Sequence, residues 1–190
     1  MSNLVQIVKA ANFAAIKHKN QRRKDPEGTP YINHPLGVAH ILTTAKVEDI
    51  EVIVGAILHD TVEDTNTTFD EIEAEFGKSV REIVGEVTDD KNLSKEERKR
   101  LQIVRAPHKS RKAKLVKLAD KLYNITDLER ATPQGWSDER KMQYFLWSAK
   151  VVLGLRGSNQ IIEDKIDEVL TRNGIEKPKE VRLDESEINE

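Results

Sequence analysis

The run His59-Asp60-Thr61-Val62-Glu63-Asp64 places an imidazole and three carboxylates at the end of an apolar stretch. Leaving charged groups unpaired on an apolar face is costly, and a bound divalent cation would remove that cost. In a helix, residues four apart lie one above the other, so Glu63 stacks on His59 and Asp64 stacks on Asp60. The spacing predicts that His59 and Asp60 hold a metal ion. Glu63 and Asp64, one turn or ~5.4 Å further along, would then act on a water or a leaving group.

Two further residues are candidate ligands. His34 directly precedes Pro35 at the expected start of a helix, and Asp120 lies in an apolar segment of another helix. Together with His59 and Asp60 they supply two imidazoles and two carboxylates, a set that suits Mn²⁺, Fe²⁺ or Zn²⁺. A plainer interpretation stays open on spacing alone, in which His34 is a packed ring and Asp120 pairs with Lys117 or Lys121.

Composition limits the class of protein. The chain has 190 residues, of which 37% are hydrophobic and 34% are charged, as expected for one domain with a polar surface. No run reaches the ~18–20 apolar residues that span a bilayer, and the N-terminus lacks a secretory signal. With no cysteine there is no disulfide framework and no cysteine nucleophile. We expect a cytoplasmic enzyme that does not bind membranes.

Charge is unevenly distributed although the net charge is only −2. Residues 91–117 are rich in Lys and Arg, with Glu96 and Glu97 as the acids. A basic segment beside an acidic metal site favours a small anionic substrate such as a phosphate ester, although a solvated helix face is the alternative. Nucleic acid is not the expected partner, because the segment lacks interleaved aromatic residues and the whole chain is not basic.

The elements that must position these residues are all predicted to be helices. Apolar residues recur with a period near 3.6, and Gly, Pro and capping residues separate the periodic segments. We expect helices over residues 4–19, 35–45, 50–64, 69–76, 80–87, 95–104, 110–130, 138–155 and 158–172. Residues 1–174 are expected to form one domain, and residues 175–190 a polar, disordered tail.

Several motifs together resemble a known family. The order of His34, His59-Asp60 and Asp120 is similar to the H…HD…D signature of the HD-domain metal-dependent phosphohydrolases. Within these, residues 5–172 resemble the hydrolase domain of the RelA/SpoT alarmone enzymes. The segment Gly135-Trp136-Ser137 is similar to the small stand-alone metazoan branch. The motifs that carry the resemblance are Gln21-Arg22-Arg23-Lys24, Thr29-Pro30-Tyr31-Ile32-Asn33-His34-Pro35, His59-Asp60-Thr61-Val62-Glu63-Asp64-Thr65 and Lys117-Leu118-Ala119-Asp120-Lys121-Leu122-Tyr123-Asn124.

The resemblance implies an HD-domain helical bundle with a single metal site between central helices. The implied activity is removal of the 3′-pyrophosphate of guanosine 3′,5′-bis(diphosphate) (ppGpp), with Glu63 and Asp64 as the catalytic acidic pair. One Mn²⁺ ion would be held by His34, His59, Asp60 and Asp120. Removal of the 2′-phosphate of NADPH in the same site is an alternative, and an inactive nucleotide-sensing module is another.

The resemblance also implies residues that bind the nucleotide. Arg23, Lys24 and Asn124 match such positions, whereas Lys95 and Arg140 are weaker candidates for phosphate contacts. One segment departs from the family, because residues 23–30 are longer and more acidic than its usual Arg-Lys-Ser-Gly-Glu-Pro loop. The sequence does not predict the oligomeric state.

Overall fold

The computed structural model describes residues 2–176, and every regular element in this part of the chain is a helix. The prediction of an all-α protein is therefore confirmed. None of these helices is both long enough and apolar enough to cross a membrane. The helices are α1 (Asn3–Lys17), α2 (Asn33–Thr44), α3 (Ile50–Leu58), α4 (Thr61–Asp64), α5 (Phe69–Phe76), α6 (Lys78–Val87), α7 (Lys95–Arg105), the 3₁₀ turn η1 (Ala106–His108), α8 (Arg111–Arg130), α9 (Asp138–Leu155) and α10 (Gln160–Arg172).

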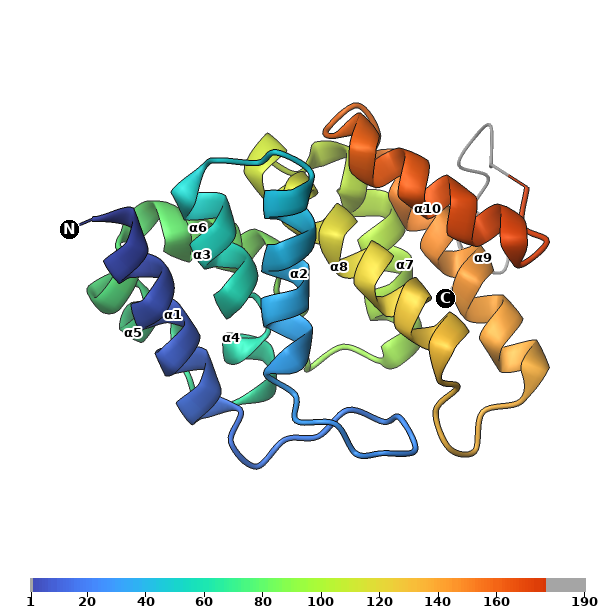
Figure 1. The fold of residues 1–190 in the computed structure, drawn as a ribbon, viewed down its shortest axis with the longest axis horizontal. Coiled ribbons are helices and arrows are strands. Elements are labelled where there is room, and N and C mark those ends of the chain that lie inside the picture. The colour runs from blue at the N-terminus through green and yellow to red at the C-terminus, as the bar shows by residue number, and fades with distance from the viewer. Residues whose placement is uncertain (1, 177–190) are drawn as a thin grey trace.

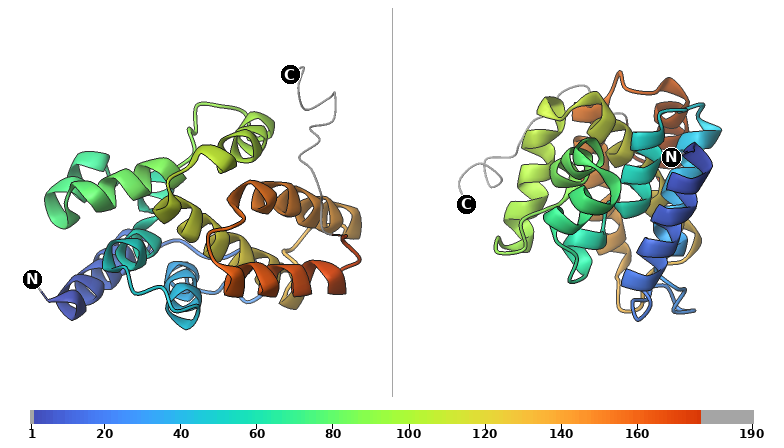
Figure 2. Two further views of the ribbon diagram at one scale, coloured as in Figure 1. Left: turned by 90° about the horizontal axis from the view of Figure 1, so that it is seen from above. Right: turned by 90° about the vertical axis from the view of Figure 1, so that its left-hand side faces the viewer.

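Two central helices organise the bundle. Helix α3 packs against α1, α2, α6 and α8, and α8 packs against α2, α3, α6, α9 and α10. In Figure 1, α1, α3, α5 and α6 form one end of the molecule, α9 and α10 form the other, and α2 and α8 lie between them. The left view of Figure 2, from above, shows the same order of the helices. Residues 52–58 of α3 are all buried, because this helix is apolar on every side.

The predicted helix over residues 50–64 is interrupted at His59 and Asp60, which separate α3 from α4. Two side chains form hydrogen bonds with backbone carbonyls here. His59 Nδ1 lies 2.7 Å from the Ala56 carbonyl oxygen, and Thr61 Oγ1 donates to the Leu58 carbonyl oxygen at 2.7 Å. Such bonds offer the backbone an alternative to the helical ladder. The Asp64 N–H still donates to the Asp60 carbonyl at 2.9 Å, so the predicted one-turn spacing between these two residues is kept.

Helix α8 begins after a capping serine. The Ser110 hydroxyl accepts a hydrogen bond from the Ala113 N–H at 3.2 Å. Residues 120, 124 and 127 follow at intervals of four and three, so Asp120, Asn124 and Asp127 share one side of this buried helix. One face of α8 thus carries a predicted metal ligand and two polar residues toward α2 and the loop before it.

The end of the folded part is described as far as residue 176. Ile175 is buried in the core, and its N–H donates to the Leu170 carbonyl at 3.0 Å. Residues 177–190, most of the predicted tail, lie outside the described residues.

Packing around α3 leads to a prediction about stability. A Cβ atom at Gly55 would lie 2.8 Å from Ile83 Cγ2, so we expect Gly55→Ala to lower the free energy of unfolding by about 1–3 kcal/mol through overpacking. Gly85→Ala is the matched control, because a Cβ there meets nothing closer than 3.7 Å and helix propensity favours alanine by up to ~1 kcal/mol. Urea unfolding of both variants measures the effect. Equal stabilisation by the two changes would contradict the predicted clash.

Candidate metal centre

Four side chains from α2, the α3–α4 junction and α8 meet at the centre of the bundle. They are the four predicted ligands, His34, His59, Asp60 and Asp120. The Nε2 atoms of His34 and His59 are 3.2 Å apart. His34 Nε2 lies 3.3 Å from Asp60 Oδ2 and 3.3 Å from Asp120 Oδ1. His59 Nε2 lies 3.1 Å from Asp60 Oδ2 and 3.7 Å from Asp120 Oδ1. Two nitrogens and two oxygens therefore face one point.

The surroundings orient both imidazoles. The contact of His59 Nδ1 with the Ala56 carbonyl assigns the proton to that nitrogen and leaves the Nε2 lone pair toward the centre. The ring of His34 lies edge-on to Tyr123, with centroids 4.9 Å apart, and is 1% exposed. Each imidazole is thus held so that Nε2 points at the carboxylates.

The centre attracts positive charge. Burial lowers the pKa of His59, but Asp60 and Asp120 outweigh this effect and raise the pKa to about 10. Burial raises the pKa of both carboxyls, yet each pKa stays well below its ordinary value because of cationic neighbours, His59 for Asp60 and Lys121 for Asp120. A field that holds a proton so firmly also favours a divalent cation.

The donor set fits such a cation. Among residues 2–176, the ligand atoms of His34, His59 and Asp120 lie within 4.8 Å of one another and all three residues are buried. The plainer interpretation of Asp120 also applies, since Lys121 Nζ donates to Asp120 Oδ2 at 3.1 Å. That bond leaves Oδ1 directed at the imidazoles, where Asn124 Nδ2 also donates to it at 2.7 Å. Pairing with Lys121 and facing the centre are therefore compatible roles of one carboxylate.

The two predicted catalytic carboxylates differ in their surroundings. Glu63 Oε2 accepts one hydrogen bond, from the Asp89 N–H at 3.1 Å. Burial raises the pKa of Glu63; this N–H opposes the shift and nearby carboxylates add to it. Asp64 instead accepts from Lys91 Nζ at 2.6 Å and from Gln21 Nε2 at 2.9 Å, one donor on each oxygen. Glu63 is therefore better suited to take a proton, whereas a donor on each oxygen holds the Asp64 carboxylate in place.

A pocket of about 420 Å³ opens beside the centre, and several predicted residues line it. Arg23, Lys24, Asn124 and Asp64 are among its lining residues. Lys95 and Arg140 are not among the described residues that line it. Both are exposed, and the Arg140 guanidinium lies 4.4 Å from the ring centroid of Trp136, a residue of the pocket wall. The structure thus brings Arg23, Lys24 and Asn124 together and leaves Lys95 and Arg140 outside the wall.

The unusual acidic loop has a structural explanation. Asp25 is buried and accepts hydrogen bonds from the Thr29 N–H at 2.9 Å and the Thr29 hydroxyl at 2.5 Å. Gly28 adopts φ of 63°, which closes the turn, and the Arg23 N–H donates to the Thr29 carbonyl at 2.8 Å. Asp25 therefore stabilises the turn of the loop that follows Arg23.

Some residues of the site are not apparent from the sequence. The Tyr31 hydroxyl donates to Asp60 Oδ2 at 2.6 Å, a bond that neither periodicity nor spacing in the sequence indicates. Burial raises the pKa of Tyr31, and the charge of Asp60 adds to this. Tyr144 and Trp136 line the pocket from α9 and the turn before it. Only the nearness of Tyr31 to His34 in the chain could have indicated one of these roles.

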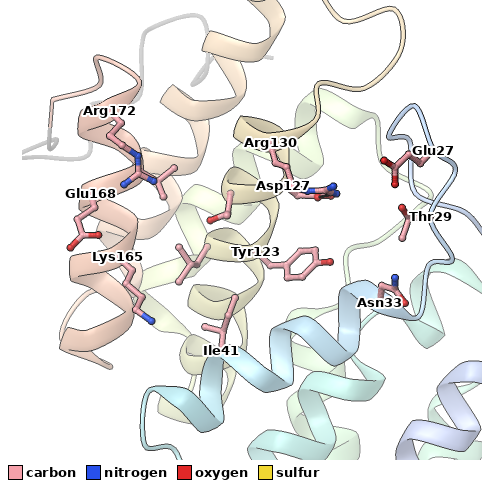
Figure 3. Close-up of a pocket in the computed structure, with 13 residues that line it drawn as sticks. Glu27, Thr29, Asn33, Ile41, Tyr123, Asp127, Arg130, Lys165, Glu168 and Arg172 are labelled. Carbon is pink, nitrogen blue, oxygen red and sulfur yellow. Dashed lines mark hydrogen bonds and ion pairs between the residues drawn. The ribbon is translucent and has the colours of Figure 1, made fainter.

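A second, larger pocket of about 640 Å³ lies between α2, α8, α10 and the acidic loop. Figure 3 shows Tyr123, Asp127 and Arg130 projecting from α8 toward Glu27 and Thr29 of the loop. Among the described residues, neither pocket is lined by the four predicted metal ligands; the first pocket adjoins them through Tyr31 and Asn124, which bond Asp60 and Asp120. Asp127 belongs to the walls of both pockets, and so marks the boundary between them.

Comparison with known proteins places this geometry in a family. Residues 10–144 match the HD domain. The chain is 63% identical over 175 residues to guanosine-3′,5′-bis(diphosphate) 3′-pyrophosphohydrolase MESH1 of Xenopus tropicalis, covering 92% of this chain and 98% of the relative. Human MESH1 is 59% identical with the same coverage of both chains. A solved structure described as a metazoan ortholog of SpoT that hydrolyses ppGpp and plays a role in starvation responses superposes with a TM-score of 0.88 at 50% identity, covering 90% of this chain and 97% of that one.

Proposed function

Because the chain belongs to the HD domain family and, within it, to the group of MESH1-type pyrophosphohydrolases, we propose that it hydrolyses ppGpp to GDP and diphosphate. Water adds to the phosphorus atom that is bonded to the 3′ oxygen of the ribose. The bond from this phosphorus to the 3′ oxygen then breaks, and the 3′ oxygen takes up a proton. The observation that carries the proposal is the convergence of two imidazoles and two carboxylates beside a pocket whose wall includes Arg23 and Lys24. The proposed domain is residues 1–174, and the expected compartment is the cytoplasm.

The proposed cofactor is one Mn²⁺ ion, with Fe²⁺ or Zn²⁺ as alternatives. It would be held by His34, His59, Asp60 and Asp120. When bound, a divalent ion polarises the phosphoryl group and makes a water molecule more acidic. The buried ring contacts and the Tyr31 hydroxyl bond keep the ligand atoms oriented before the ion arrives.

The two carboxylates of α4 have separate proposed roles. Glu63 takes the proton from the attacking water, because its raised pKa gives it proton affinity and, among residues 2–176, a single N–H engages its oxygens. Asp64, with Lys91 and Gln21 on its two oxygens, orients the water and holds the edge of the pocket. General base catalysis of this kind contributes about 10²–10⁴-fold to a rate.

The nucleotide is proposed to occupy the pocket beside the centre. Arg23 and Lys24 supply positive charge on its wall, and Asn124 links Arg23 to the ligand Asp120 through its two side-chain atoms. Lys95 and Arg140 lie outside the wall and would reach only a phosphate group that extends from the pocket. In this proposal the phosphorylated ribose lies against the centre.

The proposal is tested by an assay with two substrates. Purified protein with Mn²⁺ is expected to release diphosphate from ppGpp, and the activity is expected to disappear with a chelator and return with Mn²⁺. Parallel incubation with NADPH, followed by phosphate release, measures the alternative activity of the same site. Metal content is measured on the same samples. Tight nucleotide binding without turnover of either substrate would contradict the proposal and favour a sensing module.

A further inference from the structure

The side chain of Arg23 is held by a residue that no motif contains. Arg23 Nη2 and Nε donate to Asp127 Oδ2, at 2.9 and 3.3 Å, and Nη2 also donates to Asn124 Oδ1 at 3.0 Å. The other oxygen of Asp127, Oδ1, accepts from Arg130 Nη2 at 2.8 Å. One carboxylate thus binds two guanidinium groups, one on each side of the boundary between the two pockets.

Two aromatic rings lie against the same guanidinium. Its central carbon lies 5.8 Å from the Tyr31 ring centroid and 5.6 Å from that of Tyr123. Tyr123 in turn rests on Gly37, where a Cβ atom would lie only 2.1 Å from Tyr123 Cε2. A glycine inside helix α2 is unfavourable for the helix, so the close approach of this ring is its structural reason.

The geometry leaves one part of Arg23 for a ligand. Within residues 2–176, its hydrogen bonds use Nε and Nη2, and none uses Nη1. The side chains of Arg23 and Asp127 are 16% and 14% exposed, so their ion pair is largely shielded from water. Burial raises the pKa of Asp127, but Arg130 and Arg23 outweigh this and lower it, which keeps the carboxylate ionised.

We propose that Asp127 is a positioning residue that holds Arg23 with Nη1 directed into the nucleotide pocket. The proposal rests on the proposed function, in which Arg23 contacts the substrate. A long, flexible arginine loses much rotamer freedom when it binds a ligand, and prior fixation by a carboxylate removes part of that cost. Asp127 therefore acts on substrate affinity through Arg23 and touches neither the metal ligands nor Glu63.

The test is a double-mutant cycle with kinetics. Asp127→Asn is expected to raise KM for ppGpp about 10-fold, the range of one hydrogen bond to a charged group, while kcat stays within about twofold. In an Arg23→Ala background, the same change is expected to alter KM by less than about twofold, because its target is gone. Metal content is expected to be unchanged in every variant.

Glu129→Gln is the matched control. Glu129 lies on α8, as Asp127 does. It accepts two hydrogen bonds, of 2.9 and 3.2 Å, from Arg172 of α10 and does not contact Arg23. This variant is expected to keep the parental KM. An unchanged KM in Asp127→Asn, or an equal effect with and without Arg23, would overturn the positioning role while wild-type turnover still supports the proposed function. Failure of the wild type to bind ppGpp, measured by calorimetry, would overturn both.

Discussion

Asp60→Ala is expected to abolish hydrolysis and to remove the metal ion in the same step. Asp60 Oδ2 lies 3.1 and 3.3 Å from the two imidazole nitrogens, so in the proposed site it would supply one of the two negative charges that offset a divalent cation. Changes even to residues behind the ligands typically cost 10–100-fold in metal affinity or activity. We therefore expect loss of a ligand to lower kcat/KM by at least ~100-fold, with metal content falling in proportion.

A second variant separates charge from packing. Alanine at position 60 also deprives the Tyr31 hydroxyl of its acceptor, which could disturb the fold. Asp60→Asn keeps an oxygen for Tyr31 but removes the negative charge, and it is expected to lose the metal ion as well. Asp70→Ala, on the exposed face of α5, serves as the control. Elemental analysis and ppGpp turnover are the measurements; full metal content in Asp60→Asn would show that the Asp60 charge is not required for metal binding.

Much of this centre could be predicted because local rules determine it. The apolar period of α3 and α8 shows that they are buried, and a charged residue on such a helix needs a partner. That reasoning, with the position of His34 before Pro35, made His34, His59-Asp60 and Asp120 candidates, and the resemblance joined them into one site. The interruption of the helix at residue 59 was not predictable in the same way, because it depends on a side chain that hydrogen-bonds to a backbone carbonyl in place of a helical N–H.

Contacts between distant segments were the part that the sequence did not reveal. Arg23 and Asp127 are 104 residues apart, and neither the period of α8 nor the composition of the loop indicates that they meet. The same holds for Gly37, whose role appears only when the ring of Tyr123 is seen against it. Periodicity identifies which face of a helix is buried, but it does not identify the residue on the other element that fills the space.

Glu63→Gln is expected to lower kcat by about 10²–10⁴-fold while the metal content and KM stay close to the wild-type values. Glutamine keeps the size of the side chain and an oxygen for the Asp89 N–H, so the fold around α4 is preserved. What it removes is the carboxylate that we propose accepts the proton. This separates Glu63 from Asp60, whose loss takes the metal ion with it.

The pH dependence supplies a second signature of the same variant. A general base works in its ionised form, so the wild-type rate is expected to fall as pH drops through the pKa of Glu63. Burial raises that pKa, which moves the acid limb toward neutral pH. In Glu63→Gln the residual rate should lack this limb, whereas Glu73→Gln, at an exposed acid of α5, should retain it. A pH–rate profile of the three proteins at saturating Mn²⁺ decides the matter, since an unchanged acid limb in Glu63→Gln would assign the base to another group, with Asp64 the next candidate.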